Sequence, residues 1–458
     1  MTTRITAENI TDATITTTDL ATSVPLNTQW QAVHTADAGT PLAVVAGRGY
    51  FINTTSAVQT VTLPGSPSIG DTITIVDYAS TFATNNVTVD PGSNKIEAST
   101  TDAALSTNDQ THTFVFTDST QGWKIINQDT ASGIQPTYIS ATGGTVTTSG
   151  DFKIHTFTGD GNFVVASIGN ASGGGASSDY LVVAGGGSGG VRSPGNANGG
   201  GGAGGMRYSA ATFTSPPCAP AHPRRSTTGI DLTAATFPIT VGGGGAAVDP
   251  TPGGVAGNNG SNSVFSTITS TGGGKGGGGA GGIEDGGTGG SGGGAGGGEP
   301  GGSPNAAGNT PPTSPSQGSN GGRGGAVSPD AGSGGGGGLM GCGVNAGGSA
   351  GGPGGAGGGI PNAFGCNGTP SGGFRFYAAG AGAGNHGDYT AGNAGTGGTG
   401  FGAGAPGPAG NPSPTSAAKA GAANTGHGGG GAGAGGGHPF SSGGGGKGIV
   451  VIRYKFQN

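Results

Sequence analysis

The chain is short of both charged and apolar residues. Of its 458 residues, only 8% are charged and only 31% are hydrophobic. A globular enzyme of this length carries about 25% charged and about 45–50% apolar residues. One conventional apolar core therefore cannot span the sequence. The options that remain are disorder, a fibrous lattice, or a small β domain joined to one of these.

The sequence also lacks a high charge density, long apolar runs and the basic N-terminal flank of a signal peptide. The formal net charge of -6 is spread thinly, unlike the high charge of most disordered chains. Nucleic-acid binding requires a basic footprint, so we expect no nucleic-acid partner. No apolar stretch approaches the roughly 20 residues needed to span a bilayer, so we expect no membrane insertion. Residues 1–20 do not resemble a signal peptide. We therefore expect synthesis in a cytoplasm without signal-peptide secretion.

Cysteine is also scarce. Cys218, Cys342 and Cys366 are odd in number and widely spaced. This arrangement argues against a disulfide framework and against a zinc site. We interpret the three thiols as reduced and structurally minor.

The sequence offers little for catalysis. Glycine patterns of the GxGxxG kind carry no weight without a strand and a helix around them. In the glycine-rich region Glu284 and Asp285 form the only adjacent acidic pair, and we interpret them as solvated loop charges rather than a two-carboxylate glycosidase site. Nearby histidines lack ligand spacing and are interpreted as exposed loop residues. We expect no enzymatic activity, no cofactor and no metal. The histidines are His386, His427 and His438.

What is present begins with a polar, threonine-rich segment, residues 1–30. Its apolar side chains recur every five positions, which fits neither a helix nor a strand. We interpret the segment as an extended arm that orders only against a partner. A disordered tail is the alternative. The recurring residues are Ile5, Ile10, Ile15 and Leu20.

Residues 31–131 contain short β-branched runs separated by turn signals. Alternation of polar and apolar residues is clean in 59–63, 72–76 and 112–116. Such regular spacing is typical of an antiparallel sandwich or barrel. We expect this domain to have a small core, and residues 132–179 to be a β-rich connector. No helix signal of any length is visible. The expected large core residues are Tyr50, Phe51, Phe114, Phe116 and Trp123.

From residue 180 onward, glycine dominates a sequence that holds 114 glycines in all. The glycines come in blocks rather than at every third position, which argues against collagen. A flexible linker is the simplest alternative. However, apolar runs at 180–183 and 449–452 bracket the region. We predict that these runs lie together and close residues 180–458 into one domain.

The blocks can be ordered as polyglycine II, a helix with three residues per turn and no internal hydrogen bonds. Its N–H and C=O groups point outward in three directions, so parallel and antiparallel rods can pair on all sides. Only glycine allows the rods to approach closely. We expect the Ala and Ser interruptions to lie on outer faces, and the chain reversals to place alternate loops at the same end of the stack.

Several segments in a fixed order resemble a known family. They include KIHTFTGDGNF, DYLVVAGGGSGG, GGGGAGGMRY, ITVGGGG, GSNSVFSTITSTGGGKGGGG and GKGIVVIRY. This combination, over roughly residues 140–456, resembles the glycine-rich domains of phage tail-fibre proteins of marine phages. The β region 47–127 resembles β domains of similar fibre proteins. The glycine blocks also resemble the receptor-binding adhesins on T-even phage fibre tips. This chain departs from those adhesins because its glycine domain follows a β domain in one polypeptide.

The resemblance implies an all-β N-terminal sandwich or barrel followed by a polyglycine II domain, in a structural protein of a virion tail. It implies a homotrimer, attachment to other tail or virion proteins through the N-terminus, and binding to a host surface glycan or outer-membrane protein. A purely structural fibre or capsid-decoration protein is the alternative.

Aromatic residues and arginine between glycine blocks are the expected receptor-binding residues, since both are favoured at interfaces. Loops 360–378 and 384–391 hold most of them. The alternative is that these side chains cover the edge of the sandwich or pack between subunits. A second candidate cluster consists of Met206–Tyr208, Phe213 and residues 222–225, and a contact between domains is its alternative role. The expected receptor-binding residues are Phe364, Phe374, Arg375, Phe376, Tyr377, His386, Tyr389 and Phe440.

Overall fold

The computed structural model is nearly all β and forms two compact units, Met1–Pro136 and Thr137–Asn458. Within the described residues the only named helix is the 3-10 turn η3 (Asn362–Phe364), and no helix there has the length and apolarity needed to cross a membrane. The residues that the structure describes are 28–130, 137–170, 173–191, 197–209, 224–251, 253–279, 282–298, 300, 302–326, 331–365, 367–371, 373–385, 418–433 and 440–457.

The first unit is a sandwich of two sheets around one apolar core. That core contains four of the five aromatic residues expected from the sequence, Tyr50, Phe114, Phe116 and Trp123. Phe51 is the exception, because it points to the other face of its strand and stacks on Trp30 at 4.8 Å. One sheet has the order β1 (Gln29–Trp30), β4 (Arg48–Asn53), β6 (Thr72–Asp77), β9 (Gln110–Asp118), β10 (Gly122–Thr130), with β2 (His34–Thr35) also on β4; the other has β3 (Leu42–Ala43), β5 (Gln59–Thr62), β7 (Val87–Asp90), β8 (Ala103–Leu105).

The strands of this sandwich do not pair as an antiparallel meander. From β3 to β7 the chain alternates between the two sheets, so each strand joins its predecessor in the same sheet in parallel. Only β8, β9 and β10 add antiparallel pairs. The expected antiparallel arrangement was therefore wrong for most of this unit. The spacing of strands in the sequence gives the length of each connection between them. It does not indicate whether the next strand joins the same sheet or the other one.

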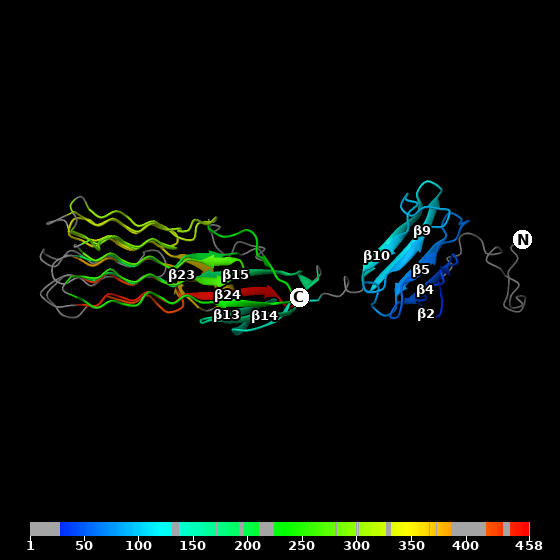
Figure 1. The fold of residues 1–458 in the computed structure, drawn as a ribbon, viewed down its shortest axis with the longest axis horizontal. Helices are drawn as coiled ribbons and strands as arrows, with labels where there is room; N and C mark the ends of the chain where they lie inside the picture. The colour runs from blue at the N-terminus through cyan, green and yellow to red at the C-terminus, as the bar shows by residue number, and fades with distance from the viewer. Residues whose placement is uncertain are drawn as a thin grey trace, which may run out of the picture. The chain divides into compact units, whose positions relative to one another are not determined.

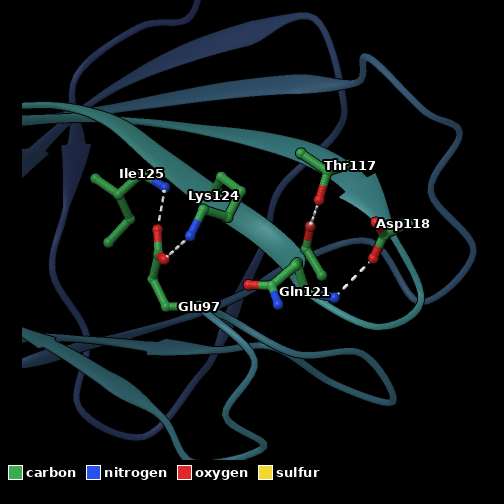
Figure 2. A network of polar contacts seen from close by, with 7 residues as sticks. Glu97, Thr117, Asp118, Gln121, Lys124 and Ile125 are labelled. Atoms are coloured by element: carbon green, nitrogen blue, oxygen red, sulfur yellow. Dashed lines mark hydrogen bonds and ion pairs between the residues drawn. The ribbon is translucent and has the colours of Figure 1, made fainter.

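The loop before β8 is tied to β10 by polar contacts (Figure 2). Glu97 accepts a hydrogen bond from the backbone N–H of Ile125 at 2.9 Å and forms an ion pair with Lys124. The Lys124 hydrogen bond is the main cause that holds the pKa of Glu97 below its usual value. At the β9–β10 turn, Asp118 accepts the N–H of Gln121 at 2.7 Å. These contacts fix the end of the sandwich.

The second unit contains three stacked sheets, which we call outer, central and cover. The central sheet packs the outer sheet on one face and the cover sheet on the other. The outer sheet is β11 (Ser140–Thr142), β14 (Gly161–Ser167), β18 (Thr236–Thr240), β19 (Ser263–Phe265), β20 (Ile268–Ser270); the central sheet is β12 (Thr145–Ser149), β13 (Phe152–Phe157), β24 (Ile449–Lys455), β15 (Ser177–Val183), β16 (Met206–Tyr208), with β17 (Ile230–Asp231) on β15; the cover sheet is β21 (Gly358–Pro361), β23 (Phe374–Tyr377), β22 (Thr369–Ser371).

Strands β11–β15 lie in this second unit, so residues 137–179 are not a separate connector. Their apolar residues complete the cores of the central sheet, and this is why they fold with the glycine-rich region. The predicted bracket is confirmed, because β24 pairs antiparallel with β15, from Asp179 opposite Arg453 to Val183 opposite Ile449. Residues 180–183 of β15 and 449–452 of β24 are continuous apolar runs because both faces of each strand are buried there.

The glycine runs form extended rods that leave the sheets side by side near β15, β23 and β24 (Figure 1). Rod 185–190 shows how they are joined. Its backbone N–H groups donate in a repeat of three residues to three different rods, at 2.9–3.1 Å. Residues 185 and 188 donate to Ser261 and Asn258, residues 186 and 189 to Gly446 and Gly443, and residues 187 and 190 to Gly202 and Gly199.

Carbonyl groups of the same rod accept from three further rods. Gly185 and Ser188 accept from Gly273 and Gly276, while Gly187 and Gly190 accept from Gly429 and Ala432. Gly186 accepts from Gly245. A repeat of three, with six neighbouring rods, is the geometry of polyglycine II and differs from the repeat of two in a strand.

Close approach makes glycine necessary at these positions. A Cβ added at Gly186, Gly187 or Gly190 would lie closer than 3.0 Å to a backbone oxygen of a neighbouring rod. No shift of a side chain can relieve such a contact, because the obstacle is backbone.

Small side chains in the rods do not lie on outer faces as expected. Ser188, Ala203, Ser291 and Ala295 have no exposed surface. The structure gives reasons for two of them. The Ser188 hydroxyl accepts the N–H of Asn258 at 2.7 Å, and Ala203 joins the apolar core at the base of the rods. A small side chain is therefore tolerated inside the lattice where it replaces a backbone acceptor or meets the core.

Candidate functional site

Hydrogen-bond register shows where the rods reverse. Rod 185–190 pairs antiparallel with rod 199–205, so the chain turns back in residues 191–198. Rod 185–190 continues directly from β15 and rod 199–205 leads directly into β16. This reversal therefore lies at the end of the rods remote from the sheets. We call that end the rod tip.

Several reversals meet at the rod tip. Val191 and Val255 form a two-way backbone bridge, which joins reversal 191–198 to reversal 246–256. Asn198 is fully buried there, and its amide accepts the N–H of Gly279 at 3.0 Å and donates to the carbonyl of Ala432 at 2.7 Å. The backbone carbonyl of Asn198 accepts from Gly384. The expectation that alternate loops share one end is confirmed for these reversals.

Asparagine amides have a role at the rim of the lattice that the sequence reasoning missed. Where a rod has no neighbour to supply a carbonyl, an asparagine side chain supplies the acceptor. Asn262 and Asn259 accept the N–H groups of Gly272 and Lys275 at 2.9 and 2.8 Å. The two asparagines are three residues apart, and so are the two N–H groups that they accept. The asparagine side chains therefore continue the three-residue repeat of the rods. The sequence signal for this role is a pair of asparagines three residues apart beside a glycine block.

The described part of the rod tip carries few ionisable groups. Asp249 is exposed and accepts a hydrogen bond from the Ser441 hydroxyl at 2.6 Å. Glu284 is buried and accepts the N–H of Gly282, whereas its neighbour Asp285 is exposed. The interpretation of both acids as solvated loop charges holds only for Asp285.

Most of the predicted aromatic run lies at the sheet end of the rods and inside the protein. Phe364, Phe376 and Tyr377 are 1%, 4% and 1% exposed. Phe364 and Tyr377 fill the core between the central and cover sheets together with Ile360. Their rings therefore cannot reach a partner in this conformation. Phe364 and Tyr377 are thus buried against the sheets, while Phe376 is buried beside Phe374.

Phe374 and Arg375 are partly exposed on β23. The Phe374 ring meets Phe376 edge-on, with centroids 6.4 Å apart. The Arg375 guanidinium donates from Nε to the side-chain oxygen of Asn362 at 3.2 Å. These two residues remain accessible, but they lie on the cover sheet and not at the rod tip.

The other predicted positions are less fully placed. Phe440 is partly exposed at the start of the returning rod 443–448. His386 and Tyr389 belong to residues 386–417, which lie outside the described residues. The four apolar residues of the N-terminal arm, Ile5, Ile10, Ile15 and Leu20, also lie outside the described residues. Asn385 itself is fully buried at the rod tip.

In the second predicted cluster, Met206 and Tyr208 are 1% and 2% exposed, so both pack inside the unit. Arg224 donates to the Ser319 hydroxyl at 3.0 Å, and burial lowers the pKa of its guanidinium. Residues 210–223 lie outside the described ranges.

His427 is fully buried, contrary to the expected exposed loop position. Its Nδ1 lies 3.0 Å from the backbone nitrogen of Ala379, and its Nε2 lies 3.0 Å from the Thr369 hydroxyl. An amide N–H can only donate, so Nδ1 must accept and the proton sits on Nε2. Burial lowers the pKa of His427 to about 4. The neutral ring thus ties rod 426–432 to β22 and to the start of rod 378–385.

A buried ion pair holds the middle of the central sheet. Arg453 Nη1 lies 3.2 Å from Asp179 Oδ2, and the guanidinium lies over the Phe152 ring at 3.4 Å. Burial lowers the pKa of Arg453 to about 10, while Asp179 acts in the opposite direction. Among the described side chains, no group of three or more His, Cys, Asp or Glu residues is placed to hold a metal ion.

Comparison with known proteins identifies one family. A family model described as a glycine-rich domain matches residues 173–455. A search of curated proteins finds no match to this chain. The matched segment begins just before β15, spans the rods, and ends in β24, so the match covers the structural unit that the rods and their bracket define. Because the match spans more than half of its length, the chain belongs to the glycine-rich domain family.

Proposed function

We propose that the chain is a structural protein of a bacteriophage tail fibre that binds a host surface receptor through the rod tip. The single observation that carries the proposal is the gathering of reversals at the rod tip, around Asn198 and the Val191–Val255 bridge. The sequence resemblance to phage tail-fibre proteins supports the viral context, and the family match supports the glycine-rich part.

The rods themselves offer little for recognition. Their backbone groups are paired with each other, and most of their residues have no side chain. Binding specificity must then come from loops, which a rigid scaffold holds at a low ordering cost. The segment between Asn385 and residue 418, which lies outside the described residues, includes His386 and Tyr389. We propose it as the first candidate for receptor contact, ahead of Phe374, Arg375 and Phe440.

The partners follow from the same proposal. The N-terminal arm, with Ile5, Ile10, Ile15 and Leu20, attaches the chain to other tail or virion proteins, and the fibre is a homotrimer in the virion tail. The rod tip contacts a host surface glycan or an outer-membrane protein.

The test replaces residues 386–417 by a short Gly-Ser reversal in phage particles that carry this chain. A matched control replaces the exposed turn 55–58 of the first unit. Both variants should assemble into particles, and only the rod-tip variant should lose adsorption to host cells, by tenfold or more. Normal adsorption of stable particles with the shortened rod tip would contradict receptor binding there and favour a purely structural or capsid-decoration role.

A further inference from the structure

A groove of about 400 Å³ lies at the sheet end of the second unit. Its walls come from β12, β13 and three residues that precede β22, namely Asn362, Gly365 and Asn367. No residue of this groove belongs to the rod tip.

The groove exists because the cover sheet does not cover the whole central sheet. Cross-strand pairs place Thr145 opposite Thr156 and Thr147 opposite Ile154, so these side chains share one face of β12 and β13. Over β24 and β15, that face is covered by the core residues of the cover sheet. At β12 the same face is exposed, and Asn362 and Asn367 form the opposite wall.

The opposite wall is held in place by two of the residues singled out in the sequence. Arg375 donates to the side-chain oxygen of Asn362 at 3.2 Å, which fixes the amide and leaves its NH₂ group as a donor for a ligand. The Tyr377 hydroxyl donates to the backbone carbonyl of Asn367 at 2.7 Å. A groove fixed in this way needs little reordering on binding.

The lining selects a class of ligand. The described residues that line the groove are Thr, Ser and Asn, with Ile154 and Gly365, and none of these is charged. An anionic or cationic ligand would lose water without gaining a counter-charge. A purely apolar ligand would leave hydroxyl and amide groups unpaired. The hydroxyl and amide groups of the lining can form hydrogen bonds with ligand hydroxyls, and the threonine methyl groups between them can contact ligand carbon atoms. A ligand with many hydroxyls on a small carbon ring meets both requirements.

We propose that this groove binds a neutral saccharide of one or two rings. Its volume falls at the lower end of the range for small-molecule sites, about 300–1,000 Å³. The site is separate from the rod tip, so it would provide the protein with a second contact to a glycan-bearing surface. Its failure would leave the rod-tip proposal intact, because the two experiments change different parts of the unit.

The experiment uses the full-length chain on an array of defined oligosaccharides, neutral ones beside sialylated, sulfated and uronic-acid ones. The best neutral di- or trisaccharide is then titrated by calorimetry. The double substitution Thr147→Val and Asn362→Leu removes two groove groups and should weaken binding by about tenfold or more, since each lost hydrogen bond is worth several-fold in affinity. The matched control is Thr142→Val on β11, an exposed strand threonine outside the groove, which should bind as the unchanged protein does.

A second variant, Thr147→Trp, fills the groove from an exposed strand position and should abolish binding with an unchanged melting temperature. The proposal is overturned if no neutral saccharide binds, if acidic saccharides bind better, or if either groove variant binds normally. It is also overturned if Thr147→Trp changes the oligomeric state measured by sedimentation, because the groove would then be a contact between copies of this chain.

Discussion

At the residue scale, the position of a glycine decides whether a side chain can replace it. A Cβ on Gly277 would lie closer than 3.0 Å to backbone atoms of Glu284 and Gly296. A Cβ on Gly243 would meet nothing within 4 Å. The two glycines belong to the same domain and differ only in the closeness of the neighbouring rods.

We therefore expect opposite results from the same substitution. Gly277→Ala should destabilise the second unit by about 1–3 kcal/mol, the usual range for overpacking. Gly243→Ala should be neutral, or stabilising by up to about 1 kcal/mol, because alanine lowers the entropy of the unfolded chain. Denaturant unfolding monitored by amide exchange of rod 185–190 measures both. Equal free energies of unfolding for the two variants would argue against a close-packed lattice.

His427 makes the second unit sensitive to acid. Its pKa is about 4 when folded, against an ordinary value of 6.5, so between these values the unfolded chain binds more protons. Its contribution to stability is thus complete above pH 6.5 and is lost as the pH falls toward 4. Protonation of Nδ1 would also set one N–H against that of Ala379.

The expected loss from this group is roughly 3 kcal/mol across that range, at about 1.4 kcal/mol per pH unit. His427→Gln cannot titrate, so it should be less stable than the unchanged protein at pH 7, and the difference should shrink toward pH 4.5. His155 also has a pKa lowered by burial, but it is present in both proteins and cancels in the comparison. A difference that stays constant with pH would rule out titration of His427 as the cause.

At the scale of elements, β24 is the strand on which the second unit depends. It pairs with β13 on one side and β15 on the other, and its alternate residues enter both cores. Nearly the whole glycine-rich region separates β24 in sequence from β13 and β15, the two strands with which it pairs.

Val451→Asp should for this reason prevent folding of the second unit. Val451 has no exposed surface, so the substitution buries a carboxylate without a partner. Val146→Asp is the matched control, since Val146 is 46% exposed on the edge strand β12. Amide-exchange protection of rod 185–190 should vanish in the first variant and persist in the second. Persistent protection with Val451→Asp would show that the rods do not require the bracket.

The sequence predicted some elements well. Alternation located β5, β6 and β9, and the two apolar runs located the bracket of β15 and β24. It did not predict that β3–β7 pair in parallel, because local alternation is the same in both kinds of sheet.

The candidate site was harder to predict for a related reason. Tyr377 is in a polar, glycine-rich context, yet β23 packs it against a sheet whose central strand ends at residue 455. The burial of a residue in this fold depends on partners far away in the sequence. Composition near the residue carries no information about such partners.

At the scale of the whole molecule, two units fold around separate cores. Both tryptophans, Trp30 and Trp123, belong to the first unit. Tryptophan fluorescence therefore reports the unfolding of that unit alone. We expect its denaturation midpoint to be the same in the unchanged protein and in Val451→Asp, within experimental error. A shifted midpoint would show that the first unit depends on the second for its stability.

The central claim is that the glycine runs form a polyglycine II lattice, and residue-resolved hydrogen exchange tests it most directly. Rod 185–190 has neighbours on all sides, so all six amides should be protected. In rod 272–278, the amides of Gly272 and Lys275 donate to asparagine side chains at the rim, whereas those at 273, 274, 276 and 277 donate to backbone carbonyls. The account predicts faster exchange at Gly272 and Lys275 than at the residues between and beside them, including Gly278, which donates to the backbone carbonyl of Ile283. Protection at alternate residues would indicate a β-strand, and uniform fast exchange would indicate a flexible linker; either result would contradict the lattice.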